Sequence, residues 1–116
     1  MLRVNLGGEG EIPGVINQQP EWVANELNKT ISRGGKTFTQ LIAEGHQFVF
    51  GPNENLPFED GSVEIVYTNN VEYNGLSYLK RPWVPESEIW RIMTDGGVWY
   101  HNGSPMWVKL WVASPI

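Results

Sequence analysis

The residues best placed to do chemistry lie near the start of the chain, in the segment "VNLGGEGEIPGVINQQPEW" at 4–22. A short apolar run ends at Gly7 and Gly8, and Gly10 follows before a second apolar run. Glycine lacks a Cβ atom and tolerates positive φ, so such a turn lets the backbone approach a bound molecule closely. An ordinary strand-to-loop turn has the same composition. The turn alone leaves both interpretations open.

A second group of polar residues follows apolar runs further along the chain. Gln18 and Gln19 end the second run, and Asn69, Asn70 and Glu72 follow the run "VEIVYT". Residues just after a strand often carry function, because a rigid scaffold positions them. Glu72 is a candidate general base. The alternative for this loop is that its side chains hydrogen-bond to its own backbone.

Metal and thiol chemistry are not expected. The chain has no cysteine, which excludes disulfides, thiolate ligands and thiol catalysis. His46 and His101 are the only histidines and belong to separate predicted strands, whereas a zinc site needs three or four ligands. We therefore expect no metal site.

The composition predicts one globular domain covering 1–116. The net charge is -5, and the eight Lys and Arg residues are scattered. We therefore expect neither nucleic acid nor an anionic membrane as a partner. No apolar run approaches the ~20 residues of a membrane span, and the start "MLRVNLGG" has no signal-peptide core. A cytoplasmic location is the simplest interpretation.

Apolar runs bounded by turn residues predict strands. The predicted strands are 2–6, 14–17, 46–51, 63–69, 97–102 and 106–114. Earlier strands alternate with helices, which favours parallel pairing. The last two are joined by "NGSP", which is too short for a helical crossover and predicts an antiparallel pair. The expected fold is a small α/β sheet, mostly parallel, with an antiparallel C-terminal strand.

Helices are predicted from apolar spacing and from start and stop signals. The predicted helices are 20–33, ended by Gly34, 37–44, ended by Gly45, and 85–95, ended by Gly96. Val23, Leu27 and Ile31 recur every four residues in the first helix. Thr37 and Gln40 have capping-box spacing at the start of the second. The segment 70–84 has no clear period and is predicted to be an irregular loop.

The segment "LPFEDGS" at 56–62 has a structural explanation of its own. Leu56 and Phe58 can pack beneath the loop, and Asp60-Gly61 suits a tight turn into the next strand. We therefore expect Glu59 and Asp60 to face solvent and not to act as an acid–base pair.

Three segments in this order resemble the Rossmann-like class I S-adenosylmethionine-dependent methyltransferases. They are "VNLGGEGEIPGVIN", "NLPFEDGSVEIVYTNNVE" and "SEIWRIMTDGGVWYH", which together cover roughly half of the chain. The resemblance implies a minimal Rossmann-like sheet of methyltransferase type, truncated relative to the full fold. It also implies a cofactor site at the carboxyl ends of the strands, beside the point where the strand order reverses.

The resemblance assigns the cofactor site to particular residues. The implied cofactor-binding residues are Gly7, Gly8, Glu9, Gly10, Gln18, Asn53, Asn69 and Asn70. The glycine turn would lie against the methionine part of S-adenosylmethionine. Asn69 and Asn70 would face the sulfonium and a methyl acceptor.

Departures from the family pattern predict weakened cofactor binding. Gln18 or Gln19 stands where family members have an acidic residue for the ribose hydroxyls. A neutral amide loses the charge-assisted strength of those bonds, roughly a factor of two per bond. Pro52 or Asn53 occupies the place of an aspartate near the adenine, and Asn70 the place of a histidine.

The final predicted strand suggests a second kind of function. In "MWVKLWV", Trp107, Lys109 and Trp111 share one face. The opposite face, which we assign to the core, has Met106, Val108, Leu110 and Val112. Exposed tryptophans on a terminal strand predict a homodimer through Trp107 and Trp111, unless a loop from 74–84 covers them. The chain is therefore either a methyltransferase-like cofactor-binding protein or a catalytically inactive binding and assembly module of the same fold.

Overall fold

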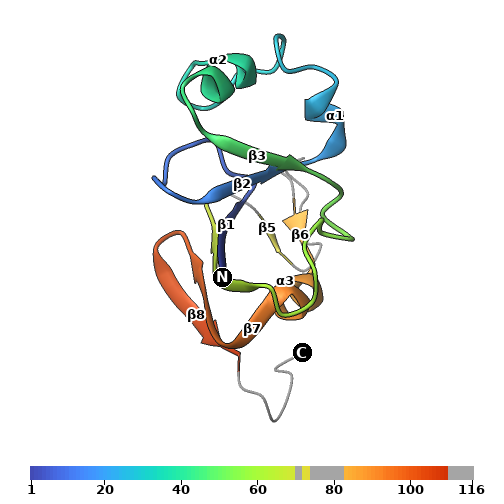
Figure 1. Cartoon of the computed structure of the whole chain (residues 1–116), viewed down its shortest axis with the longest axis vertical. Helices are drawn as coiled ribbons and strands as arrows, with labels where there is room; N and C mark the ends of the chain where they lie inside the picture. The colour runs from blue at the N-terminus through green and yellow to red at the C-terminus, as the bar shows by residue number, and fades with distance from the viewer. Residues whose placement is uncertain (70–71, 74–82, 110–116) are drawn as a thin grey trace.

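The computed structural model describes residues 1–69, 72–73 and 83–109, and its centre is a six-stranded sheet (Figure 1). The strands are β1 (Leu2–Leu6), β2 (Ile16–Gln19), β3 (Gln47–Phe50), β4 (Val63–Thr68), β7 (Met93–His101) and β8 (Ser104–Val108). Their order is β3-β2-β1-β4-β7-β8, and only the β7–β8 pair is antiparallel. The predicted α/β class and the predicted pairing directions are confirmed.

The strand order reverses between β1 and β4. From β1 the chain builds outward through β2 to β3, and it then returns to the other side of β1 to add β4 and β7. In open α/β sheets the crevice outside the carboxyl ends of the strands at such a reversal is where ligands bind. Within 70–84, predicted as an irregular loop, β5 (Glu72–Tyr73) and β6 (Trp83–Val84) form a separate parallel pair. Asn70 and Trp111 lie outside the described residues.

The helices are α1 (Glu21–Ala24), α2 (Phe38–Ala43) and α3 (Glu86–Ile92). The predicted 20–33 helix is wrong, because α1 ends at Ala24 and the chain continues in turns. The backbone N–H and the hydroxyl of Thr30 both donate to the Glu26 carbonyl, at 2.9 and 2.8 Å, and Ile31 then bridges to Thr37. This bridge leaves Ile31 63% exposed instead of on a buried helix face. Among the described residues, no helix is long and apolar enough to cross a membrane.

The capping box predicted for the second helix is confirmed. The Thr37 side chain accepts from the Gln40 backbone N–H, and the Gln40 side chain accepts from the Thr37 backbone N–H at 2.8 Å. The third helix ends earlier than Gly96, because Met93 already begins β7. Lys109 Nζ donates to the carbonyls of Trp90 and Met93, at 2.9 and 2.8 Å, and so satisfies acceptors at the end of α3.

The two faces of the sheet have separate apolar clusters. The larger cluster lies under α3 and the 56–60 loop and contains Val4, Leu6, Leu56, Phe58, Val63, Val66, Val84, Ile89, Ile92, Met93 and Trp99. Around β3, the smaller cluster joins Val23 of α1 and Phe38 of α2 to Phe48 and Phe50. Val49 packs against the larger cluster, so alternate residues of β3 serve opposite faces.

Arg91 of α3 fastens the 56–60 loop to the helix. Its guanidinium donates to the carbonyls of Leu56 and Phe58, both at 2.9 Å, and to the carboxylates of Asp60 and Glu88, both at 2.8 Å. The Arg91 hydrogen bond lowers the pKa of the Glu88 carboxyl, and it raises the pKa of Arg91 itself. The predicted burial of Leu56 and Phe58 and the exposure of 59–60 are confirmed.

The predicted assignment of the two faces of the last strand is reversed. The Trp107 ring lies 5.3 Å from that of Trp99 and 5.6 Å from that of Trp90, measured between centroids, so it packs against the core. Met106 and Val108, predicted to be core residues, are 37% and 48% exposed. Trp107 follows the register of β7, where it pairs with the fully buried Trp99.

Candidate functional site

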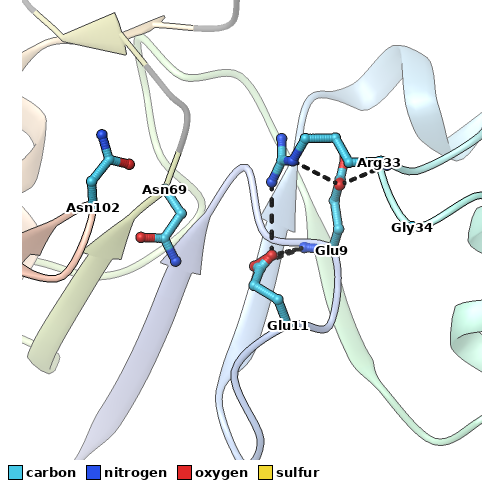
Figure 2. Close-up of a pocket in the computed structure, with 6 residues that line it drawn as sticks. All are labelled: Glu9, Glu11, Arg33, Gly34, Asn69 and Asn102. Atoms are coloured by element: carbon cyan, nitrogen blue, oxygen red, sulfur yellow. Dashed lines mark hydrogen bonds and ion pairs between the residues drawn. The ribbon is translucent and has the colours of Figure 1, made fainter.

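A cavity of about 400 Å³ lies at the carboxyl edge of the sheet, where the strand order reverses (Figure 2). It is lined by Glu9 and Glu11 from the turn after β1, Arg33 and Gly34 from the 31–37 turn, Asn69 after β4, and Asn102 between β7 and β8. Figure 2 shows the two asparagines on one side of the cavity and the charged side chains on the other.

The glycine turn after β1 does not offer free backbone N–H groups to a ligand. The N–H of Gly7 donates to Gln18 Oε1, that of Gly8 to the Asn5 carbonyl, that of Glu9 to the Glu11 carboxylate, and that of Gly10 to Asn17 Oδ1, at 3.1 to 3.2 Å. A phosphate-binding turn instead aims such N–H groups at the anion. Recognition of a ligand in this cavity therefore depends on side chains.

Two glycines of the turn are required by contacts inside the protein. A Cβ atom at Gly8 would lie 2.3 Å from Asn17 Oδ1, and one at Gly10 would lie 2.9 Å from the His46 ring. Gly10 also has a φ of 84°, which side chains disfavour. Close packing of the turn onto β2 and the start of β3 thus explains both glycines without a bound molecule.

Gln18 ties three segments together beneath the turn. It is fully buried, its Oε1 accepts from Gly7, and its Nε2 donates to the Gly51 carbonyl and to Asn53 Oδ1, both at 2.9 Å. The neighbouring Gln19 donates to the Gly8 carbonyl at 2.9 Å. The amides at the end of β2 therefore hold the turn and the loop after β3 in place.

The charged side of the cavity is a small ion-pair network. Glu9 Oε1 accepts from the Arg33 backbone N–H at 3.0 Å and lies 3.4 Å from the Arg33 guanidinium, while Glu11 lies 3.8 Å from it. Glu11 also accepts from the Asn5 side chain. The Arg33 side chain is 48% exposed and that of Glu9 16%. Two carboxylates and one guanidinium give the cavity lining a formal charge of -1.

The structure brings only some of the residues implied by the resemblance into the cavity. Glu9 and Asn69 line it. The three glycines form the turn beside it, Gln18 and Asn53 are bonded to each other, and Asn70 lies outside the described residues.

Sequence reasoning missed four lining residues, Glu11, Arg33, Gly34 and Asn102. A helix through residue 33 would have separated Arg33 from the turn, and Asn102 looked like a simple turn residue. The run "EGE" at 9–11, which has two acidic residues on either side of a glycine, was the one sequence signal that could have indicated Glu11.

Fold and site together define an α/β protein with a polar, weakly acidic cavity at the reversal of its sheet. Among the described residues, no three His, Cys, Asp or Glu side chains come together as metal ligands. A scan against protein-family models and searches of curated proteins and solved structures found no match to this chain.

Proposed function

We propose that the chain is a cytoplasmic S-adenosylmethionine-binding protein of Rossmann-like methyltransferase type, with weakened affinity for the cofactor. The charge of the cavity lining carries this proposal. S-adenosylmethionine has a sulfonium, an ammonium and a carboxylate, so its net charge is +1. The lining has the complementary set, with Glu9 and Glu11 for the cationic groups and Arg33 for the carboxylate.

Each wall of the cavity has a role in this proposal. Glu9 and Glu11 bind the ammonium, and Arg33 turns from them to the carboxylate. The ion pairs of the exposed Arg33 are worth only about 0–1 kcal/mol each, so their rearrangement costs little. Asn69 lies on the wall where the sulfonium and an acceptor would meet. When bound, the cofactor supplies an electrophilic methyl group.

The proposed site is expected to bind the ribose and adenine of S-adenosylmethionine more weakly than the methionine part. The Gln18 amide already makes hydrogen bonds through both of its terminal atoms, and Asn53 Oδ1 is one of its partners. The Gln18 amide is therefore not available to a ribose without breaking a buried bond. The affinity therefore rests on the methionine end of the cofactor.

Calorimetric titration tests the proposal. The wild type should bind S-adenosylmethionine more tightly than S-adenosylhomocysteine, which lacks the sulfonium charge. Arg33→Ala should weaken binding about tenfold or more, the effect of one hydrogen bond between charged groups. Arg3→Ala is the matched control, because Arg3 is equally exposed, 49% against 48%, and does not line the cavity. Absence of binding to either compound at millimolar concentration would refute the proposal.

The alternative is a catalytically inactive homodimeric assembly module. Met106 and Val108 favour it, because they are exposed on the outermost strand of the sheet. Pro105 and Lys109 disfavour pairing along the strand edge, so face-to-face packing is the expected mode. Trp107, one of the two contact residues predicted from the sequence, packs against the core, and Trp111 lies outside the described residues. We therefore expect the dimer contact to involve Met106 and Val108.

Light scattering separates this alternative from a monomer. The double substitution Met106→Glu and Val108→Glu should dissociate a dimer. Ile42→Glu is the control, because Ile42 is an exposed apolar residue on α2, 41% exposed, away from β8. A wild-type monomer at micromolar concentration would rule the dimer out.

A further inference from the structure

The two carboxylates of the cavity are held in place by N–H groups of the protein. Glu9 Oε1 accepts from the Arg33 backbone N–H at 3.0 Å, and Glu11 accepts from the Glu9 backbone N–H at 3.2 and 3.3 Å. The fully buried side chain of Asn5 also donates to Glu11. None of these bonds uses the Arg33 guanidinium, so the carboxylates do not depend on that side chain for their positions.

The Arg33 guanidinium is held loosely beside these carboxylates (Figure 2). Its Nε lies 3.4 Å from Glu9 Oε1 and its Nη2 lies 3.8 Å from Glu11 Oε2, both beyond the usual N–H···O range of about 2.7–3.2 Å. The side chain is 48% exposed, so solvent screens both ion pairs. Next to Glu11, the buried Asn5 Oδ1 has no hydrogen-bond partner among the described residues. This wall of the cavity therefore has more acceptors than the guanidinium satisfies.

The backbone that carries Arg33 is tied down, which leaves the side chain as the part that can move. Within the 31–37 turn, the Ser32 N–H donates to the Lys36 carbonyl at 2.8 Å, and the Arg33 N–H is bonded to Glu9. Figure 2 shows the Arg33 side chain reaching from this turn toward the two carboxylates. Rotation of the side chain therefore moves the guanidinium without disturbing the turn.

A bound ligand changes the partners of Arg33 in a way that depends on the charges of the ligand. An ammonium group that binds Glu9 and Glu11 has to displace the guanidinium, because both cations use the same acceptors. A simple amine leaves the displaced guanidinium without a counterion. An α-amino acid also has a carboxylate, to which the planar guanidinium fork can donate two parallel hydrogen bonds. The zwitterion therefore replaces the contact that it breaks, and the amine does not.

We infer that Arg33 is a specificity-determining residue, which makes the cavity select free α-amino-acid zwitterions over amines that lack a carboxylate. Its side chain blocks Glu9 and Glu11 in this structure, and it binds the carboxylate of the ligand once the ammonium has displaced it. This selectivity rests on the proposed function, because that function places the methionine part of S-adenosylmethionine at this wall. Free amino acids such as methionine are then ligands of the cavity in their own right.

L-methionine and L-methioninol test this selectivity, because methioninol keeps the ammonium and has a hydroxymethyl group in place of the carboxylate. Binding is followed by NMR through the backbone N–H signals of Glu9 and Arg33. The wild type should bind methionine in the millimolar range and methioninol at least about tenfold more weakly. Arg33→Ala should weaken methionine binding about tenfold and tighten methioninol binding about three- to tenfold, because the variant has neither a fork for the carboxylate nor an internal competitor.

Two further variants control for charge and for the loss of the side chain. Arg3→Ala makes the same change in net charge, and Arg3 is equally exposed, 49% against 48%, and does not line the cavity. It should alter both affinities by less than about twofold. Arg33→Lys keeps a cation beside Glu9 and Glu11 and should keep the affinity for methioninol close to that of the wild type.

The opposite signs expected for the two ligands separate this role from a structural one. Equal weakening of both ligands by Arg33→Ala would overturn the inference, and so would a methioninol affinity equal to that of Arg3→Ala or the absence of a saturable response to methionine. If both ligands behave as expected and S-adenosylmethionine does not bind, only the proposed function fails. If S-adenosylmethionine binds and Arg33→Ala does not tighten methioninol binding, only the selectivity fails.

Discussion

The substitution Gln18→Glu probes why an amide stands where an acidic residue was expected. It changes one NH₂ group to an oxygen and leaves the shape of the side chain almost unchanged. In the wild type that NH₂ group donates to the Gly51 carbonyl and to Asn53 Oδ1, both at 2.9 Å, in a fully buried position. The new carboxylate would face two acceptor oxygens and keep only the Gly7 N–H as a donor. The amide is thus required by the fold.

The expected loss of stability follows from these bonds. One buried and one part-buried hydrogen bond are lost, and a charge is left without a counterion in the interior. Together these should lower the free energy of unfolding by about 3–5 kcal/mol near neutral pH. Burial raises the folded-state pKa of the new carboxyl above its unfolded value of about 4.3. The protonated acid can donate one hydrogen bond, so the deficit should shrink to about 1–2 kcal/mol as the pH falls below the folded-state pKa.

Urea unfolding of the variant at about pH 5 and pH 8 measures both effects. Gln47→Glu is the matched control, because Gln47 lies on β3 with an exposed side chain and the change in charge is the same. Its stability should change by less than about 0.5 kcal/mol. If Gln18→Glu is as stable as Gln47→Glu at pH 8, the carboxylate is tolerated, and the structural account of Gln18 is wrong.

Three further predictions concern the frame around the site. Arg91→Met should lower the free energy of unfolding by about 3 kcal/mol in a urea titration, because it removes the counterion of Glu88 and the hydrogen bonds that the Leu56 and Phe58 carbonyls accept from Arg91. Because Arg91 lowers the folded-state pKa of Glu88, that pair stabilises the protein above the unfolded pKa of about 4.3, and the gain is lost as the pH falls through the folded-state pKa. Glu88→Gln should flatten this acid limb of the stability curve, and an unchanged limb would contradict the assignment. Gly10→Ala should lower the melting temperature, since its φ of 84° and the His46 ring 2.9 Å from the added carbon both oppose a side chain, and a change within error would show that the turn adjusts freely.

The sequence predicted the sheet better than the helices, for physical reasons. Strands such as Val63–Thr68 are continuous β-branched and aromatic runs, and the short "NGSP" link permits only an antiparallel return. In the first helix, the spacing of Val23, Leu27 and Ile31 was apolar and regular, but α1 ends at Ala24 and Ile31 pairs with Thr37 in an isolated β-bridge. The apolar spacing of a segment does not reveal such a backbone pairing with residues further along the chain.

The cavity could be predicted only in part, because its walls come from distant segments. Glu9 and Asn69, which the resemblance assigned to one site, line the same cavity at the reversal of the sheet. Arg33 reaches that edge through the Ile31–Thr37 bridge, which depends on backbone pairing and has no simple sequence signal. The two faces of the last strand were confused because Trp107 and Val108 are both apolar, so alternation alone could not say which of them meets α3.

The bonding of Gln18 also sets the affinity at which the proposed cofactor must be sought. A family site with a carboxylate makes two charge-assisted bonds to the ribose, each worth about 1.5–3 kcal/mol, and Gln18 makes neither because its amide is bonded within the protein. Their loss amounts to at least about 3 kcal/mol, which is roughly 150-fold or more in the dissociation constant. A site that would bind at a few micromolar is then expected to bind at roughly 0.5 mM or more weakly. A titration that stops at micromolar ligand would therefore miss binding through Glu9, Glu11 and Arg33, and only the millimolar range can decide between a weakened site and an abandoned one.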